Sequence, residues 1–170
     1  MPLPPPASAP TARLRVALAD ETATATLAGR LAAALEPGDV VWLSGGLGVG
    51  KTTLVRALLT SLGHTGRVRS PTFTLLEPYN LSRFPIYHFD FYRFSSEDEW
   101  RDAGFGEYFR GEGVCLVEWP EQAGPGLPAP DLHIRLAFAG DDPHAGGRIA
   151  ELDALSGAGQ RCLSAAAAGS

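Results

Sequence analysis

Hydrophobic and polar residues alternate at the start of the chain and then change to a helical spacing. Residues 13–18 alternate polar and apolar side chains, which is typical of a half-buried strand. Asp20 is a good N-cap residue, and the leucines that follow it at helical spacing are Leu27, Leu31 and Leu35. This pattern predicts a strand followed by an amphipathic helix that begins after Asp20.

A continuous apolar run comes next and predicts a buried strand. Turn residues at 36–39 precede the run Val40–Leu43, whose character suits the centre of a parallel sheet. After a glycine-rich loop, residues 51–62 place four apolar side chains on one face. We expect a helix there that ends at Gly63, because glycine commonly terminates helices.

The rest of the chain contains five further apolar segments and one helix signal. We expect strands at 72–76, 86–91, 114–117, 132–138 and 148–155, with residues 78–85 connecting the first two and the last two pairing in antiparallel fashion. A capping box at Ser96–Glu99 predicts a short helix that Gly104 ends. Together these elements predict an α/β fold of three layers, with a mainly parallel central sheet, helices on both faces and an antiparallel C-terminal part.

Length and composition predict a single domain with two flexible tails. With 170 residues, 45% of them hydrophobic, the chain can bury one real core. Proline and alanine dominate residues 1–12, and small residues, mostly alanine and glycine, dominate residues 156–170. We therefore expect a domain at 13–155 between an N-terminal tail and an Ala-rich C-terminal tail.

The loop after the Val40–Leu43 run carries the clearest chemical signal. Its sequence matches G-x-x-x-x-G-K-[ST] in full and lies between a predicted strand and a predicted helix. Glycines let the backbone curl around phosphates, the lysine reaches the β and γ oxygens, and the hydroxyl can bind Mg²⁺. The predicted nucleotide-binding residues of this P-loop are Gly45, Gly46, Leu47, Gly48, Val49, Gly50, Lys51, Thr52 and Thr53. The pattern predicts a P-loop NTPase-like fold that binds Mg-nucleotide.

Two apolar runs end in acids that could serve such a metal. Asp90 follows the run at 86–89, and Glu118 follows the run at 114–117. If both strands lie parallel to Val40–Leu43, their carboxyl ends meet at the edge of the sheet where ligands bind. We therefore expect Asp90 and Glu118 to lie near the metal and the phosphates.

Three further features have both a structural and a functional interpretation. The Ser70–Thr74 segment stands where a switch that senses the γ-phosphate could lie, but proline followed by threonine is also ordinary at a strand entry. His88 is expected to be a core or surface histidine, and Trp119 is expected to fill core. The sequence favours the structural interpretation for all three.

Charge and cysteine content narrow the function classes. A net charge of −5 argues against direct binding of a nucleic-acid backbone. The two cysteines, Cys115 and Cys162, fit neither a zinc site nor a disulfide framework, and no apolar run could span a membrane. Lys51 is the only lysine beside thirteen arginines among the 14 basic residues. We expect a cytoplasmic protein that does not contact membranes, with its single lysine in the phosphate loop.

Four segments together resemble the TsaE family, also called YjeE. They are Leu-Ser-Gly-Gly-Leu-Gly-Val-Gly-Lys-Thr-Thr at 43–53, Ser-Pro-Thr-Phe-Thr-Leu at 70–75, Tyr-His-Phe-Asp-Phe-Tyr-Arg at 87–93 and Leu-Val-Glu-Trp-Pro-Glu at 116–121. Many families share a P-loop, but these four segments in this order and spacing are specific. The resemblance extends over about residues 20–148.

This resemblance implies an activity, two partners and a set of site residues. It implies a Mg-dependent ATPase, weak alone and stimulated by the TsaB–TsaD pair, which supports formation of threonylcarbamoyladenosine beside the anticodon and meets tRNA only indirectly. The implied catalytic residues are Lys51, Asp90 and Glu118, and the implied metal-binding residues are Thr52, Glu118 and Asp90. Thr24 and Arg148 fall at further nucleotide-contacting positions. Gly46 departs from the family, which commonly has an acid there, so any contact of that carboxylate is in question.

Other P-loop classes remain as alternatives. A small-molecule kinase uses the same loop and metal, although the arginines after the loop are scattered rather than gathered in a lid. A GTPase would need a second lysine for guanine selection, which this chain lacks. A nucleotide-gated binding module, in which hydrolysis times assembly with a partner, overlaps with the family interpretation.

Overall fold

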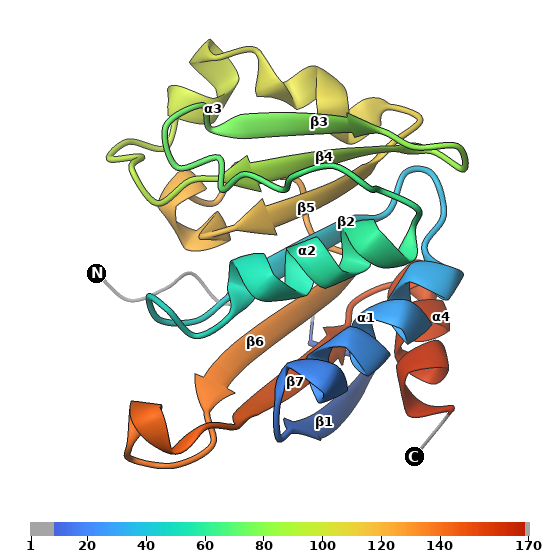
Figure 1. Ribbon diagram of the computed structural model, residues 1–170. Coiled ribbons are helices and arrows are strands. Elements are labelled where there is room, and N and C mark those ends of the chain that lie inside the picture. Colours follow the sequence, from blue (N-terminus) through green and yellow to red (C-terminus); the bar gives the residue numbers. More distant parts are fainter. Residues whose placement is uncertain (1–8, 169–170) are drawn as a thin grey trace.

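The apolar runs of the sequence form the strands of one seven-stranded sheet (Figure 1). The computed structural model describes residues 9–168. The strands are β1 (Ala12–Leu18), β2 (Val40–Ser44), β3 (Leu76–Asn80), β4 (Pro85–Asp90), β5 (Val114–Glu118), β6 (Leu132–Phe138) and β7 (Arg148–Ala154), in the order β1-β7-β6-β2-β5-β4-β3. The chain is therefore a mixed α/β protein with a single sheet.

The sheet is less parallel than the sequence pattern predicts. The central strands β6, β2, β5 and β4 are parallel, whereas β1–β7, β6–β7 and β3–β4 are antiparallel pairs. The expected pairing of β6 with β7 is confirmed, but β1 from the N-terminus adds to β7, and β3 adds an antiparallel strand at the other edge. A mainly parallel sheet with only a C-terminal antiparallel part was wrong, because a short connection reverses the chain between β3 and β4, and β1 pairs with β7 from the opposite end of the chain.

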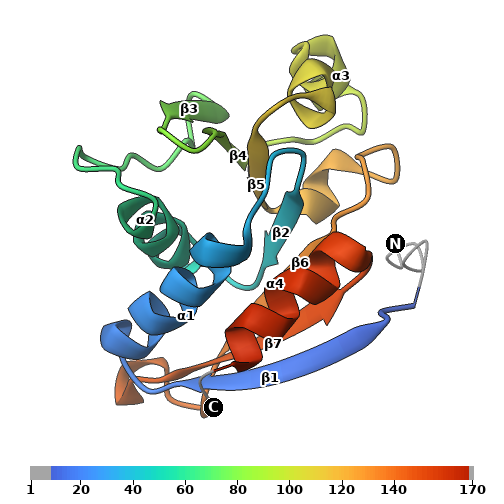
Figure 2. The same cartoon turned by 90° about the vertical axis from the view of Figure 1, so that its right-hand side faces the viewer.

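Three helices cover one face of the sheet (Figure 2). They are α1 (Glu21–Ala34), α2 (Lys51–Ser61) and α4 (Gly157–Ala167), and α1 packs between the other two. The predicted N-cap of α1 is confirmed, since the Asp20 carboxylate accepts a hydrogen bond from the Ala23 N–H. Gly63, with φ of +99°, follows α2 as predicted.

The other face carries an aromatic core under three short helices. These are α3 (Glu99–Asp102) and the 3-10 helices η1 (Phe105–Arg110) and η2 (Pro120–Ala123). Phe89, Phe91 and Trp100 are buried in this second core. The Glu99 carboxylate accepts the Ser96 N–H as in the predicted capping box, although Asp98 rather than Ser96 occupies the N-cap position. Helices thus lie on both faces, as the sequence predicts.

The segment expected to be a strand at 72–76 is mostly a turn. Leu75 has φ of +68°, and its N–H donates to the Pro71 carbonyl at 2.8 Å. Its own carbonyl accepts from the Asp90 N–H at 3.1 Å, so the turn is joined to the end of β4. Strand β3 begins at Leu76, directly after this turn, and includes part of the expected connection 78–85. The prediction is wrong because β propensity depends on context, and this segment forms a turn although its composition favours a strand.

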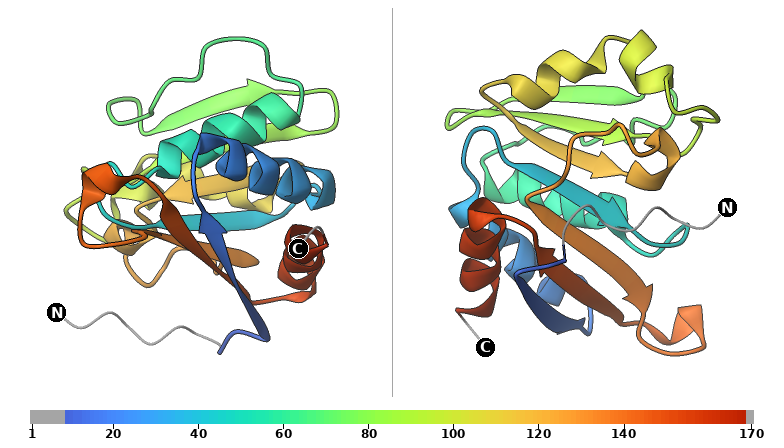
Figure 3. Two further views of the ribbon diagram at one scale, coloured as in Figure 1. Left: turned by 60° about the horizontal axis from the view of Figure 1, so that its bottom comes forward. Right: turned by 180° about the vertical axis from the view of Figure 1, so that it is seen from behind.

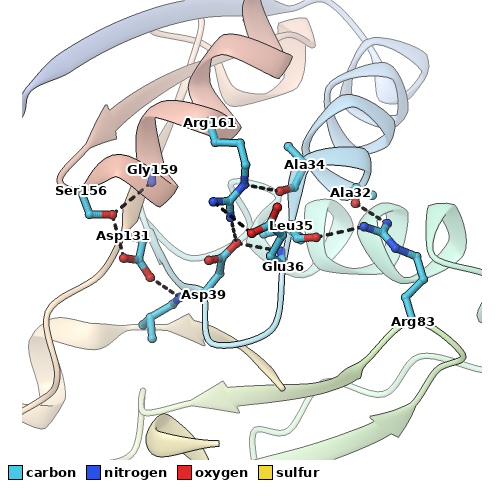
Figure 4. Close-up of polar contacts among 11 residues, drawn as sticks. Ala32, Ala34, Leu35, Glu36, Asp39, Arg83, Asp131, Ser156, Gly159 and Arg161 are labelled. Atoms are coloured by element: carbon cyan, nitrogen blue, oxygen red, sulfur yellow. Dashed lines mark hydrogen bonds and ion pairs between the residues drawn. The ribbon is translucent and has the colours of Figure 1, made fainter. Parts of the chain in front are cut away.

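The C-terminal residues form a helix rather than the predicted tail at 156–170. Ser156 caps α4, since its Oγ accepts from the Gly159 N–H and donates to the Asp131 carboxylate at 2.7 Å (Figure 4). A Cβ on Gly159 would overlap the Asp131 carbonyl oxygen. Cys162 is buried, and burial raises the pKa of its thiol to about 11. Small residues here allow close packing, which composition alone cannot distinguish from disorder.

An arginine fixes α4 to the loop before β2. Arg161 donates to the Ala34 carbonyl at 2.8 Å and pairs with the buried Asp39 carboxylate at 2.5 Å (Figure 4). Arg83 from the other side donates to two more carbonyls at the end of α1, those of Ala32 and Leu35. These bonds satisfy helix-end carbonyls that otherwise have no intrahelical partner.

The N-terminal end of the described chain also belongs to the sheet. The Thr11 N–H donates to the Ala154 carbonyl at 2.8 Å, and β1 begins at Ala12. Figure 3 shows β1 along the outer edge beside β7. The expected tail at 1–12 is therefore wrong for residues 11 and 12, and residues 1–8 lie outside the described part. None of the helices within residues 9–168 has the length and apolar character needed to cross a membrane.

Candidate functional site

The P-loop joins β2 to α2 in a conformation that needs several of its glycines. Gly48 and Gly50 have φ of +73° and +111°, which side chains disfavour. Gly45 has φ of +145°, and a Cβ there would lie 2.5 Å from the Leu136 carbonyl oxygen on β6. The predicted loop lies between the predicted strand and helix, with the N-terminus of α2 at its end.

Lys51 is the first residue of α2, and its ammonium group lies inside the loop. Its Nζ donates to the Gly45 carbonyl at 2.5 Å and to the Gly46 carbonyl at 2.9 Å. The residue is only 5% exposed, and burial lowers the pKa of the ammonium, although nearby carboxylates, Glu118 foremost, oppose this effect. A buried cation with only carbonyl partners at hydrogen-bond distance is suited to attract an anion.

Thr52 and Glu118 come together from different elements. The Thr52 Oγ1 donates to both oxygens of the Glu118 carboxylate, at 3.1 and 3.2 Å. Glu118 is the last residue of β5, next to β2 in the sheet, and it is 2% exposed. The structure therefore brings the predicted hydroxyl and carboxylate into direct contact.

Asp90 lies beside Glu118, because β4 and β5 are parallel neighbours and these residues are register partners. Asp90 is 5% exposed, and its Oδ1 accepts the Tyr92 N–H at 2.9 Å. Burial raises the pKa of this carboxyl, and the charge of Glu118 raises it further, while the Tyr92 N–H, His88 and Lys51 oppose the shift. Two buried acids side by side favour a cation between them.

A pocket in front of the loop gathers most of the predicted residues. Among its lining residues are P-loop positions 47–53, Asp90 and Glu118. Ser70 and Thr72 also line it and bond to each other at 2.9 Å, which places the candidate switch segment at the pocket. Gly45 and Gly46 are not among its lining residues, and their carbonyls accept hydrogen bonds from Lys51.

Trp119 has both a structural and a functional position. It is partly buried against the second core, as expected, and it also lines this pocket, with the Lys51 Nζ 4.1 Å from its ring centroid and the Tyr92 ring 4.8 Å away. Its φ of +56° places a bulky residue in the left-handed region, where such residues are unusual. The sequence signal was its position directly after Glu118, where the chain must leave the strand at the edge that binds ligands.

Thr24 and Arg148 meet in a second pocket next to the first. Val49, Gly50 and Thr53 line both pockets, so the P-loop separates them. The Arg148 side chain donates to the Val49 carbonyl at 2.9 Å, which connects β7 to the loop. Further lining residues that sequence reasoning missed are Leu18, Ala19, Asp20, Glu21, Leu136, Gly146 and Gly147. Their backbone and loop positions gave no chemical signal.

His88 is a core histidine, which is one of the two positions expected from the sequence, but it also contacts a predicted site residue. It is fully buried, with a relative exposure of 0%, and its Nε2 lies 2.6 Å from Glu118 Oε2. A position two residues before Asp90 on the same strand puts both side chains on one face, and this alternation was the available signal.

The donor set suits a hard divalent cation with few protein ligands. Within residues 9–168, no group of three or more His, Cys, Asp and Glu side chains is arranged to hold a metal. Thr52, Glu118 and Asp90 instead offer one hydroxyl and two carboxylates, all oxygen atoms. Mg²⁺ is commonly bound by one or two carboxylates together with phosphate oxygens and waters, so the residues present fit it.

Comparison with known proteins gives a consistent picture. The family model described as "Threonylcarbamoyl adenosine biosynthesis protein TsaE" matches residues 18–145. The tRNA threonylcarbamoyladenosine biosynthesis protein TsaE of Bacillus subtilis is 48% identical over 119 residues, which are 70% of this chain and 74% of the relative. The protein of the same description from Haemophilus influenzae is 40% identical over 126 residues, 74% of this chain and 77% of the relative.

A solved structure extends the likeness to nearly the whole fold. The crystal structure of Bacillus subtilis YdiB is similar with a TM-score of 0.76 and 34% identity, covering 92% of this chain and 95% of that one. Its coverage exceeds the range of the family model, so the likeness extends beyond residues 18–145. With a matching family model and relatives at 40% identity or more, the chain belongs to the TsaE family.

Proposed function

We propose that this protein is a Mg-dependent ATPase of the cytoplasm that acts with TsaB and TsaD to form threonylcarbamoyladenosine on tRNA. The observation that carries the proposal is the contact of the P-loop hydroxyl of Thr52 with the buried Glu118, beside the Lys51 ammonium. The relatives are named as tRNA threonylcarbamoyladenosine biosynthesis proteins. On this proposal, the sheet and its helices constitute a three-layer P-loop NTPase-like fold.

The nucleotide would occupy both pockets along the P-loop. Backbone N–H groups of residues 45–50 and the N-terminus of α2 would hold the phosphates, with Lys51 reaching the terminal ones. The pocket in front of the loop would hold the phosphates and is called the phosphate pocket below. Thr24 and Arg148 would contact the nucleoside, because the pocket that they line shares three P-loop residues with the phosphate pocket. The two pockets thus support a nucleotide lying across the loop.

Magnesium would be held by Thr52, Glu118 and Asp90. The ion would neutralise negative charge on the phosphate oxygens, which is the usual metal contribution to phosphoryl transfer. Glu118 receives hydrogen bonds from two sides, from Thr52 and at the His88 contact, so its orientation is restricted. The Tyr92 N–H restricts the orientation of the Asp90 carboxylate, which would hold the ion or a water molecule.

Partner proteins would supply what this site lacks for rapid turnover. Leu47, Phe73 and Tyr92 are exposed large hydrophobic residues, and Leu47 and Tyr92 line the phosphate pocket. Exposed apolar groups at a pocket mouth are consistent with an interface that closes it. Contact with tRNA would be indirect, in keeping with the net charge of −5.

The test is ATP hydrolysis by the purified protein with Mg²⁺, alone and with its TsaB and TsaD partners. We expect little hydrolysis alone and a clear rise with both partners, which Glu118→Ala should remove without weakening Mg-free nucleotide binding. Hydrolysis that the partners leave unchanged would contradict the proposal. Activity that instead depends on a small acceptor molecule would assign the site to a kinase.

A further inference from the structure

We infer that His88 is a positioning residue for Glu118, which it holds in the orientation that faces Thr52. The inference rests on the proposed function, because it gives Glu118 a fixed direction for the metal. His88 itself would touch neither metal nor nucleotide, since it is fully buried beneath the carboxylate. It is also absent from the residues that line the phosphate pocket.

The strand geometry places the two side chains face to face. His88 and Asp90 have the same parity on β4, and Glu118 is the register partner of Asp90 on the neighbouring β5. His88 therefore lies one strand pleat below the acids, on the face that α2 covers. From there its Nε2 reaches Glu118 Oε2 at 2.6 Å, while Thr52 reaches the same carboxylate from α2.

The two ring nitrogens have different environments. Nδ1 is buried and has no hydrogen-bond partner among the described residues, whereas Nε2 contacts the carboxylate. A carboxylate accepts hydrogen bonds, so the proton belongs on Nε2 and His88 is the donor. The ring thus makes one side-chain hydrogen bond, and that bond is to Glu118.

A purely structural histidine would be expected to have a different set of partners. Buried polar groups in cores normally satisfy each of their polar atoms, yet His88 leaves one nitrogen without a partner to make a single short contact. Residues that orient metal-binding groups in this way typically change metal affinity or activity by about 10- to 100-fold when replaced. The arrangement therefore matches a residue retained for Glu118 rather than for packing.

Two replacements with side chains of similar length to each other distinguish a positioning role of His88 from a packing role. His88→Gln places an amide N–H at the position of Nε2, whereas His88→Met places a methyl group there, and both remove Nδ1. Nucleotide affinity is measured with a fluorescent ATP analogue, in excess EDTA and in Mg²⁺, and the melting temperature is recorded. We expect His88→Met to reduce the affinity gain from Mg²⁺ by about 10-fold, His88→Gln to keep most of it, and both to leave Mg-free binding unchanged.

Repeating the pair in a Glu118→Gln background separates positioning from packing. There His88→Met should change the magnesium gain by less than about 2-fold, because coupled residues are not additive. Equal losses in His88→Met and His88→Gln, or a full further loss in the Glu118→Gln background, would overturn the inference. If the unmodified protein shows no gain from Mg²⁺, the proposed metal site fails instead, independently of His88.

A spectroscopic readout needs no substitution of His88. In the full-length protein labelled with ¹⁵N, the His88 Nε2 should carry a proton that is protected from exchange and shifted downfield by the carboxylate. Glu118→Gln should move this signal while leaving those of the other three histidines, His64, His133 and His144, in place. Absence of a proton on Nε2 would overturn the inference even if the methionine variant does not fold.

Discussion

The two ends of the central strands carry buried charges in different ways. At the amino end of β2, Asp39 is paired with Arg161 and accepts the Glu36 N–H, so its charge is compensated. At the carboxyl end, Lys51 makes hydrogen bonds to carbonyls, and Asp90 accepts one N–H. Both ends bury charge, but only the first end matches each charge with an opposite one at contact distance.

The pKa directions follow this difference. Burial lowers the pKa of Lys51 and raises that of Asp90, so each shift favours the uncharged form. For Arg161, burial also acts to lower the pKa, but the bond to Asp39 outweighs it and the net shift is upward. Incomplete compensation at one end only is the physical sign that a charged ligand belongs there.

The largest expected effect is the loss of nucleotide binding in Lys51→Ala. On the proposed function, removing the buried ammonium would delete its charge-assisted hydrogen bonds to phosphate, each of which contributes about 1.5–3 kcal/mol. We expect the affinity for ATP to fall by about 100-fold, with little change in the free energy of unfolding. Isothermal titration and a denaturant melt measure the two effects. A large loss of stability would mean that Lys51 is structural, like Arg161.

The opposite result is expected for Arg161→Ala. This change leaves the buried Asp39 carboxylate without its cation and frees the Ala34 carbonyl at the end of α1. Because the arginine side chain is 32% exposed, we expect the free energy of unfolding to fall by about 2 kcal/mol, which is less than the loss expected for a fully buried pair. Urea unfolding measures it, with the exposed Arg67→Ala as control. Weakened ATP binding in the folded Arg161→Ala protein would contradict the comparison.

The sequence predicted the carboxyl end of the sheet far better than the amino end. The P-loop motif specifies its own backbone, and acids after apolar runs locate Asp90 and Glu118 at one edge of the sheet. The amino-end contacts join residues far apart in the chain, such as Asp39 with Arg161 and Asp131 with Ser156. No local pattern marks these pairs, so the sequence predicts a tail where the structure has α4.

The same distinction applies to individual residues whose contacts no local pattern marks. His88 and Trp119 have side chains whose roles depend on what lies across the strand, not on their neighbours in sequence. Leu75 in its positive-φ turn gave no glycine or asparagine signal. Local chemistry was therefore predictable, and contacts between distant segments were not.

His133 offers a smaller test, on the other face of the sheet. Its Nε2 lies 2.8 Å from the Ser44 Oγ, just before the P-loop, and burial, aided by Arg135, lowers its pKa to about 4. The unfolded pKa is near 6.5, so the unfolded state takes up a proton first and stability falls as pH drops from 6.5 towards 4. We expect this residue to lower the free energy of unfolding by about 1.5 kcal/mol between pH 7 and pH 5.

His133→Gln should remove this part of the pH dependence, while the exposed His144→Gln should not. Urea unfolding at both pH values measures the difference. ATP affinity at pH 7 should stay the same, which would assign His133 to the stability of the sheet although it lies close to the loop. An unchanged pH dependence in His133→Gln would show that other groups, such as Asp153, are responsible.

The smallest effect is expected at Gly46, where the resemblance to the TsaE family implies an acid in its place. Gly46 is exposed, its φ is not positive, and a Cβ there would meet nothing within 4 Å, so Gly46→Asp should fold normally. An added exposed carboxylate near the phosphates costs about 0.5 kcal/mol, or roughly 2-fold in ATP affinity by titration. Gly45→Asp is the matched control, because its Cβ would lie 2.5 Å from the Leu136 carbonyl oxygen and should abolish binding. A comparable loss in Gly46→Asp would mean that the loop tolerates no side chain at this position, although the position has room for a Cβ and does not need a positive φ.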